Sequence, residues 1–262
     1  MSFKRLLKSV VRDLLPHAGL DFRTPSGIHL LVPDRGAWSS TGEIFIARSY
    51  DVFFPRLEMV RGWVDLGCNQ GFFSFALLEH LARINNNAQP ETWACLFDAN
   101  ETCVARVNDA ITRNSLQSRW KCSQAVIGPP NSFVNFERHK DSVHSNIFSV
   151  GRSDKVLSLP TTNLTESLAG RKEFFDLIKI DIEGAEKFLF QHHSTLLNRF
   201  RFGICEWHSP QFSGHDLLAA IEKAGWRVVQ FCSSTDRYDI QKGHSWGSPF
   251  GVALWENPAP SR

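Results

Sequence analysis

Apolar residues along this chain follow two different rhythms, which alternate from about residue 62 onward. Short runs are apolar at nearly every position, as expected of strands buried on both faces of a sheet. Longer stretches place apolar residues at helical spacing. Strands and helices that alternate in this way predict parallel strands joined by right-handed crossovers. The strand-like runs are GWVDL, TWACLFD, WKCSQAVIG, FFDLIKIDI and RFGICEW, and helices are expected over about 72–84, 101–114, 185–192 and 214–225.

The last two strand-like runs, WRVVQFCSS and PFGVALWEN, have no helical pattern between them. A hairpin of antiparallel strands is the most economical connection for such a pair. The whole pattern therefore predicts an α/β fold of the Rossmann-like, doubly wound kind. Its seven-stranded sheet is mostly parallel, and its last strand is antiparallel.

Two segments depart from the alternation. Residues 21–61 combine a strand-like run, IHLLVP, with turn signals and a second apolar run, and we interpret them as a cap beside the sheet. Residues 129–160 hold two strand-like runs around a polar loop, which predicts an inserted strand excursion that faces the substrate. We divide the chain into an N-terminal helix and cap segment (1–61), one α/β domain (62–256) and a tail (257–262).

Composition limits the classes of partner. The net charge of +2 is small, and the lysines and arginines are scattered, which argues against a nucleic-acid partner.

The first 15 residues have a basic amphipathic pattern, for which we favour a helix docked on the domain over one bound to a membrane surface. No apolar run approaches the roughly 20 residues that span a bilayer, so no stable membrane insertion is expected. The six cysteines form no C-x-x-C pair, which favours a reducing compartment, the cytoplasm.

The first candidate site is the loop that follows the run GWVDL. Asp65 ends this run, and Gly67, Asn69 and Gly71 follow at intervals of two before a helical pattern begins at Phe72. A glycine loop between a strand and a helix is typical of nucleotide-sized crevices in α/β sheets. The spacing differs from the dinucleotide fingerprint, and an acid before the first glycine would repel a pyrophosphate. The loop therefore favours a cationic or hydroxyl-bearing ligand.

A second acid, Asp98, ends the next strand-like run. In α/β cofactor folds the acid after the second strand accepts hydrogen bonds from ribose hydroxyls. A purely structural role, as N-cap of the following helix, is the alternative, and we favour the ribose role.

A third group of charged residues lies at the end of the run FFDLIKIDI. Period-2 alternation places Lys179 and Asp181 on one face of the strand, and Glu183 follows as the chain turns into a helix. Burial of these charges is costly unless they are paired or used by a ligand, so we place them in an active site. For Glu186 an ion pair with Lys179 is the structural alternative.

Glu206 and His208 share a face at the end of the run RFGICEW. A carboxylate beside an imidazole suits a general base or, together with Asp181, part of a metal site. We favour the base and assign no metal ligand. A hydrogen-bonded structural role for His208 stays equally open.

These motifs together resemble the FkbM-type methyltransferases, which use S-adenosylmethionine and have the class I methyltransferase fold. The loop DLGCNQGFFS resembles the first motif of the family, and LIKIDIEGAEKFLF resembles its most characteristic segment. The segments SQAVIG, LPTTNLTESL and ICEWH follow in the family's order, so the resemblance covers roughly residues 51–229. Asp98 replaces the family's frequent glutamate, and Ala99 and Cys68 replace its common proline and alanine.

The resemblance implies a role for each matching residue. Asp181 would stand near the sulfonium and the acceptor, and Asp98 would hold the ribose. The residues that would contact the rest of the cofactor are, for its methionine part, Asp65, Gly67, Asn69, Gly71 and Phe72 and, for its adenine side, Ala99, Gln124 and Ala125.

The activity expected from the resemblance is methyl transfer to a hydroxyl of a sugar, glycan or secondary metabolite. Glu206 or His208, or with less support Asp181, would accept the hydroxyl proton, while Lys179 and Glu183 fix the geometry. A metal-assisted O-methyltransferase that uses Asp181, Glu206 and His208 is one alternative, and a non-catalytic cofactor-binding scaffold is another. The sequence leaves the oligomeric state open. By location alone, residues of an acceptor pocket could be Trp38, Phe53, Phe54 and His144.

Overall fold

The computed structural model of the chain describes residues 19–86, 90–137, 156–168, 175–234 and 244–260. The predicted N-terminal helix and His144 lie outside the described residues.

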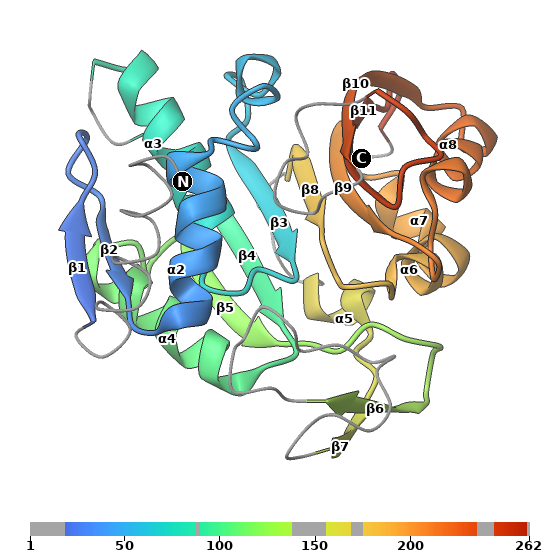
Figure 1. The fold of residues 1–262 in the computed structure, drawn as a ribbon, viewed down its shortest axis with the longest axis horizontal. Helices are drawn as coiled ribbons and strands as arrows, with labels where there is room; N and C mark the ends of the chain where they lie inside the picture. Colours follow the sequence, from blue (N-terminus) through green and yellow to red (C-terminus); the bar gives the residue numbers. More distant parts are fainter. Residues whose placement is uncertain (1–18, 87–89, 138–155, 169–174, 235–243, 261–262) are drawn as a thin grey trace, which may run out of the picture.

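A seven-stranded sheet forms the centre of the molecule and confirms the predicted fold class (Figure 1). Its order is β10-β11-β9-β8-β3-β4-β5, and β11 runs antiparallel to both β10 and β9. The remaining neighbours are parallel. The strands are β3 (Gly62–Leu66), β4 (Trp93–Asp98), β5 (Trp120–Gln124), β8 (Leu177–Ile180), β9 (Phe202–His208), β10 (Arg227–Ser234) and β11 (Phe250–Glu256).

The strand order reverses between β3 and β8. From β3 the chain builds outward through β4 to β5, and from β8 it builds outward through β9 in the opposite direction. In open α/β sheets, ligands bind in the crevice beyond the carboxyl ends of the strands at such a switch point. The glycine loop after β3 and the charged segment after β8 therefore flank this crevice.

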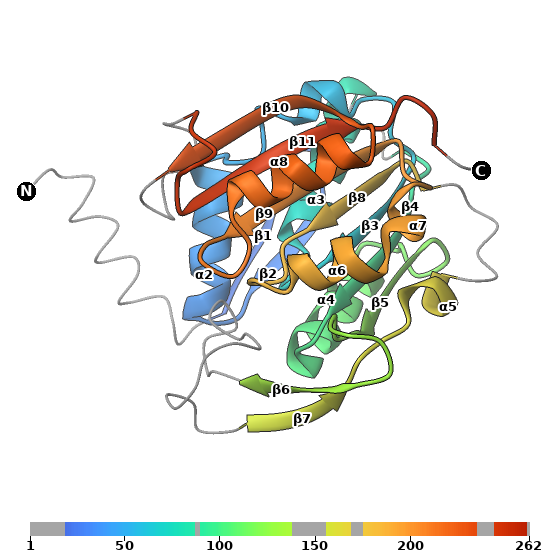
Figure 2. The same ribbon diagram turned by 90° about the vertical axis from the view of Figure 1, so that its right-hand side faces the viewer.

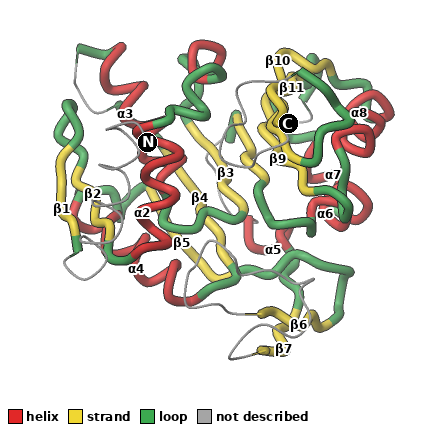
Figure 3. Tube along the Cα trace, in the orientation of Figure 1, coloured by secondary structure: helices red, strands yellow, loops and turns green. Residues whose placement is uncertain are grey.

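Helices cover both faces of the sheet (Figures 2 and 3). Trp63 of β3 packs in one apolar cluster with Leu77, whereas its neighbour Val64 packs in the other with Leu217. This alternation explains why β3 is buried at all five positions. One face carries α3 (Phe72–Ile84) and α4 (Glu101–Arg113), and the other carries α5 (Leu164–Leu168), α6 (Glu186–His192), α7 (Ser194–Leu197) and α8 (Gly214–Lys223).

Residues 20–61 pack on the α3 side of the sheet, and we refer to them as the cap. Phe53 and Leu57 have no exposed surface and belong to the same apolar cluster as α3. The second apolar run of this segment, GEIFIAR (residues 42–48), is helical over Gly42–Ile46 because it continues the helix that Asp34 caps. The elements of the cap are β1 (Leu20–Arg23), β2 (His29–Val32), α2 (Arg35–Thr41), η1 (Gly42–Ile46) and η2 (Phe54–Arg56).

The predicted excursion is an antiparallel pair of strands, β6 (Phe133–Glu137) and β7 (Val156–Pro160). We call this pair the ribbon. It follows β5 and lies beyond the end of the sheet where β4 and β5 finish (Figure 1). Phe133 and Val156 are 71% and 54% exposed, and Phe136, although buried, belongs to neither apolar cluster, so the ribbon adds little to the core. No helix among the described residues is long and apolar enough to cross a membrane.

Candidate active site

The glycine loop adopts a backbone that only small side chains permit. Gly67 and Gly71 have φ angles of +72° and +74°, and Asn69 between them has 49°. A Cβ on Gly67 would lie 1.7 Å from the carbonyl oxygen of Asp181. The amide groups of Gly67 and Cys68 also donate to the carbonyl of Phe97, at 2.9 and 3.0 Å. The loop is thus pressed between the ends of β4 and β8, which explains why glycine occupies position 67.

Lys179 connects the glycine loop with two carboxylates. Its Nζ donates to the Gly67 carbonyl at 3.0 Å and to Asp181 Oδ2 at 3.1 Å, and it lies 3.4 Å from Asp65 Oδ1. Asp65 and Lys179 are directly paired in the register of β3 and β8. Asp65 also accepts a hydrogen bond from Ser74 at 2.7 Å. The two strands therefore form a charged floor beneath the loop.

This floor is buried: Asp65 has no exposed surface and Lys179 is 3% exposed. Burial lowers the pKa of Lys179, but the carboxylates of Asp181 and Asp65 outweigh it, so the pKa lies above its usual value and the ammonium stays charged. Burial raises the pKa of Asp65, an effect that Lys179 and Ser74 partly oppose. Asp65 thus lies beneath the loop and reaches the crevice through Lys179.

Asp98 lies on the other side of the loop. Its two carboxylate oxygens accept hydrogen bonds from the amide groups of Asn69 and Asn100, each at 2.8 Å. Burial raises the pKa of Asp98 to about 6, although these two amide groups lower it. The alternative role of Asp98 as a helix N-cap is wrong, because Asn100 caps α4 by accepting from the amide of Thr102.

The predicted adenine-side residues surround Asp98. The amide of Ala125 donates to the Asp98 carbonyl at 3.0 Å, and the side chain of Gln124 donates to the Ala99 carbonyl at 2.9 Å. The pairing of β4 with β5 sets Asp98 directly beside Gln124. The structure thus brings these four residues together.

Four carboxylates surround His208, three from residues after β8 (Asp181, Glu183 and Glu186) and one from Glu206 within β9, and we call these five residues the acidic cluster. His208 Nδ1 lies 3.0 Å from Glu186 Oε1. Its Nε2 lies 3.8 Å from Asp181, 3.7 Å from Glu183 and 3.6 Å from Glu206. Burial lowers the pKa of His208, but Glu186, Glu206 and Glu183 raise it well above its usual value. Glu186 also accepts from the amide of Ile182, so it joins this cluster and not Lys179.

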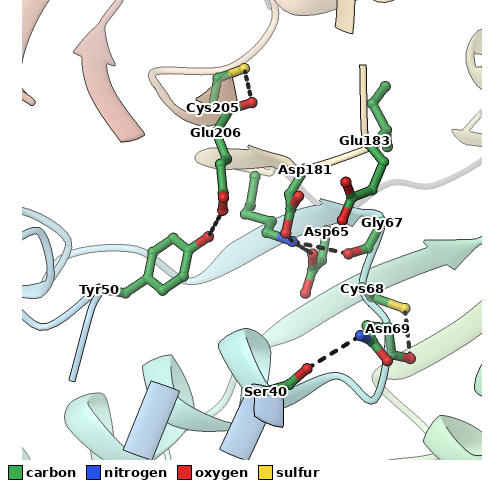
Figure 4. Close-up of polar contacts among 12 residues, drawn as sticks. Ser40, Tyr50, Asp65, Gly67, Cys68, Asn69, Asp181, Glu183, Cys205 and Glu206 are labelled. Atoms are coloured by element: carbon green, nitrogen blue, oxygen red, sulfur yellow. Dashed lines mark hydrogen bonds and ion pairs between the residues drawn. The ribbon is translucent and has the colours of Figure 1, made fainter. Parts of the chain in front are cut away.

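A pocket of about 380 Å³, which includes space open to solvent, lies between the glycine loop, Asp181 and the cap. Sequence reasoning missed the cap's main contribution, Tyr50, whose hydroxyl donates to Glu206 Oε2 at 3.2 Å (Figure 4). No periodicity marks this residue; it is simply one of two tyrosines in the chain. The pocket is lined by Ser40, Glu43, Ile44, Tyr50, Gly67, Cys68, Asn69, Gln70, Phe72, Phe73, Lys179 and Asp181.

Three aromatic residues proposed for an acceptor pocket instead pack in the apolar core. Phe53 and Phe54 are almost fully buried, and Trp38 packs against the same cluster. The ring of Phe53 lies beside Tyr50 and that of Phe54 beside Phe73, with centroid separations of 6.4 and 6.1 Å. They support the pocket wall from behind.

A family model described as the methyltransferase FkbM domain matches residues 65–228, which is more than half of the chain. The chain belongs to the FkbM methyltransferase family. The match begins at Asp65, spans the glycine loop and the acidic cluster, and ends in β10. No curated protein matches this FkbM methyltransferase.

Several solved structures that resemble this FkbM methyltransferase are described as methyltransferases, and their sequence identity to this chain is low. The METTL16 MTase domain is 13% identical, with 98% of this chain and 92% of that one covered and a TM-score of 0.49. An O-methyltransferase family protein from Burkholderia thailandensis is 11% identical over 86% and 60% of the chains, with a TM-score of 0.46. The B. subtilis M1A22 tRNA methyltransferase TrmK is 10% identical over 81% and 67%, with a TM-score of 0.43.

Proposed function

We propose that this protein uses S-adenosylmethionine to methylate a hydroxyl oxygen of a sugar, a glycan or another small-molecule acceptor. The observation that carries the proposal is the position of the pocket. It opens where the strand order reverses, and it lies between a glycine loop and the acidic residue Asp181. S-adenosylmethionine, when bound, supplies an electrophilic methyl group on a sulfonium cation.

The residues around the pocket suit this cofactor. The ammonium of Lys179 is already paired with Asp65 and Asp181, so the polar wall suits a cation better than it suits a phosphate. The main chain of the loop, with Asn69 and Phe72, would hold the methionine part. Asp98 would accept hydrogen bonds from the ribose, and the neighbouring residues would border the adenine: Ala99, Gln124 and Ala125.

Asp65 and Lys179 act as positioning residues in this proposal. Lys179 ties the Gly67 carbonyl to the carboxylate of Asp181, and Asp65 holds the ammonium from below. Methyl transfer is a displacement that depends on alignment of the acceptor oxygen with sulfur and carbon. A rigid loop and a fixed Asp181 would contribute to that alignment.

The acceptor proton has a route into the acidic cluster. Asp181 lines the pocket and touches what the pocket holds, whereas Glu206 and His208 are 4% and 5% exposed and lie behind it. Tyr50 lines the pocket as well and donates to Glu206. We therefore place Asp181 and the Tyr50–Glu206 pair nearest to the acceptor hydroxyl, with His208 as the group that stabilises the negative charge behind them.

Calorimetric titration with S-adenosylmethionine tests the proposal at its first step. We expect one site per chain in the wild type and at least about tenfold weaker binding by Asp98→Ala, which loses the acceptor for the ribose hydroxyls. Absence of binding to the wild type would overturn the proposal.

A mass-shift screen identifies the acceptor. The protein is incubated with cofactor that carries a deuterated methyl group and with separate pools of glycans, small metabolites and total RNA. Label in a glycan or metabolite hydroxyl supports the proposed acceptor class, and label confined to RNA contradicts it. The RNA pool also tests the sequence-based expectation that nucleic acid is not a partner.

A further inference from the structure

His208 presents a buried ring nitrogen that has no hydrogen-bond partner. The residue is 5% exposed, and its Nε2 is among the buried polar atoms that make no hydrogen bond. Three carboxylates face this atom, from Asp181, Glu183 and Glu206, at 3.6–3.8 Å. These distances exceed a hydrogen bond, and they are too short for a bridging water, which would separate the atoms by about 4.5 Å. Facing three carboxylates, Nε2 carries either a proton, which the raised pKa of His208 favours, or a metal ion that replaces this proton.

The same atoms have the spacing of ligands around one ion. Asp181, Glu206 and His208 each offer a ligand atom, and these atoms lie within 4.8 Å of one another. Donor atoms bound to one divalent cation at about 2.1 Å lie roughly 3.0–3.5 Å apart. The distances from Nε2 to the facing carboxylates exceed this spacing by only a few tenths of an ångström, and the three ligand atoms, which lie within 4.8 Å of one another, would draw together around an ion. Asp181 and Glu183 point toward the same region in Figure 4.

The other ring nitrogen of His208 is already fixed in the way that metal-binding histidines require. Nδ1 lies 3.0 Å from Glu186 Oε1, and Glu186 has no exposed surface. When Nδ1–H donates to this carboxylate and a metal replaces the proton on Nε2, Nε2 becomes a ligand that lies 3.8 Å from Asp181 and 3.6 Å from Glu206. A histidine that is oriented by a carboxylate on one side and offers its second nitrogen to a metal is a recurrent arrangement.

The charge around the cluster also favours a cation. Besides Lys179, five carboxylates surround His208 and the floor, namely Asp65, Asp181, Glu183, Glu186 and Glu206. Neighbouring carboxylates repel one another strongly at low dielectric unless a counter-charge lies between them.

We propose that Asp181, Glu206 and His208 bind a divalent cation of the Mn²⁺ type. One imidazole with two carboxylates suits Mn²⁺, Fe²⁺ or Zn²⁺ better than it suits Ca²⁺ or Mg²⁺, which prefer oxygen ligands alone. Glu183 is placed to act as a further ligand, and Asp181 lies on the pocket wall.

The role of the cation in catalysis rests on the proposed function, although its binding does not. Bound beside the pocket, the cation would lower the pKa of the acceptor hydroxyl, whose proton would pass to the carboxylate of Glu183. The oxygen would then bond to the methyl carbon as the carbon–sulfur bond breaks and the cofactor leaves as a neutral thioether.

Titration of the full chain with Mn²⁺ tests the site without any need for an acceptor. Metal is removed with a chelator, the chelator is removed by gel filtration, and free Mn²⁺ is followed by electron paramagnetic resonance. We expect one site per chain in the wild type and at least about tenfold weaker binding in Glu206→Gln and His208→Gln. Undiminished free Mn²⁺ signal with the wild type, or binding by both variants equal to that of the wild type, overturns the site.

Asp98→Asn is the matched control. It removes one carboxylate at the end of another strand of the same sheet, outside the acidic cluster, and should bind Mn²⁺ like the wild type while its affinity for S-adenosylmethionine falls. Mn²⁺ affinity that falls equally in Asp98→Asn shows a general effect of charge and overturns the assignment.

Two further measurements keep the outcomes separate. If a variant does not unfold cooperatively, the site is tested by thermal unfolding of the wild type instead. Mn²⁺ should raise the melting temperature of the wild type, and an unchanged melting temperature overturns the site. Binding of S-adenosylmethionine without binding of Mn²⁺ overturns the cation site alone. Binding of Mn²⁺ without binding of the cofactor overturns the proposed function and leaves the cation site standing.

Discussion

At the scale of single residues, the charged side chain of Lys179 lies in an almost fully buried position. It is buried with two carboxylates in contact and holds the Gly67 carbonyl. We expect Lys179→Met to lower the free energy of unfolding by about 3–5 kcal/mol at pH 7, because it leaves buried carboxylates without a counter-charge. Urea denaturation measures this loss.

The double variant Asp65→Asn with Lys179→Met separates charge from packing. The amide introduced at position 65 would be neutral and could still accept the hydrogen bond from Ser74, so the double variant should recover part of the lost stability. A double variant that is less stable than Lys179→Met alone would contradict the view that uncompensated charge causes the loss.

Asp98 carries the second residue-scale prediction, a pH dependence of cofactor binding. The ionised carboxylate is the better acceptor for ribose hydroxyls, and burial holds the pKa of Asp98 at about 6. Affinity for S-adenosylmethionine should therefore rise about tenfold from pH 5 to pH 7 as the carboxyl group loses its proton. Calorimetry at intervals of half a pH unit measures the curve. Asp98→Asn cannot titrate at this position, and a similar rise in this variant would assign the effect to another group.

At the scale of elements, the glycine loop depends on its close approach to β8. Gly67→Ala would place a Cβ 1.7 Å from the Asp181 carbonyl oxygen, so the loop must move. We expect cofactor binding to weaken by at least about a hundredfold, which corresponds to about 3 kcal/mol of binding free energy. Calorimetry with S-adenosylmethionine measures it.

Gly225→Ala is the control for Gly67→Ala. Gly225 also has a positive φ angle, +73°, but nothing lies within 4 Å of an added Cβ. This variant should lose only the roughly 1–2 kcal/mol of stability that a left-handed alanine costs, with cofactor affinity unchanged. Equal effects of the two substitutions on affinity would contradict the role of close packing against β8.

The elements differ in how far the sequence predicts them. Helix α3 begins and ends at the predicted residues, and the strands of the central sheet follow their apolar runs, because both are buried strongly and regularly. The short helices α5 and α7, of five and four residues, are too brief to show a period. The run GEIFIAR is apolar yet helical, because its conformation is set by the helix before it.

The residues of the site also differ in how far the sequence predicts them. The neighbouring strands β9, β8, β3 and β4 place Glu206, Asp181, Asp65 and Asp98 at or near their carboxyl ends, and a pattern of strands and acids predicts this placement. Tyr50 meets Glu206 across 156 positions of sequence, and only the packing of the cap on α3 brings them into contact. Local patterns carry no information about such a contact.

At the scale of the whole molecule, the cap and the ribbon relate to the core in opposite ways. Phe53 and Leu57 of the cap are fully buried, whereas Phe133 and Val156 of the ribbon are largely exposed. The ends of the ribbon are also joined, since the amide of Thr161 donates to the Ser132 carbonyl at 2.9 Å. Removal of the cap should therefore expose the core, and removal of the ribbon should not.

Two deletions test this difference. Replacement of residues 133–160 by Asn-Gly, a sequence that favours a tight turn between Ser132 and Thr161, should leave cooperative thermal unfolding intact. It should also change the affinity for S-adenosylmethionine by no more than about threefold, or roughly 0.6 kcal/mol. Deletion of residues 1–61 should abolish cooperative unfolding, because it uncovers apolar residues of α3 such as Phe73 and removes Tyr50 from Glu206. A cap-less protein that unfolds cooperatively and binds the cofactor would show that the glycine loop and the strand ends form the site without the cap.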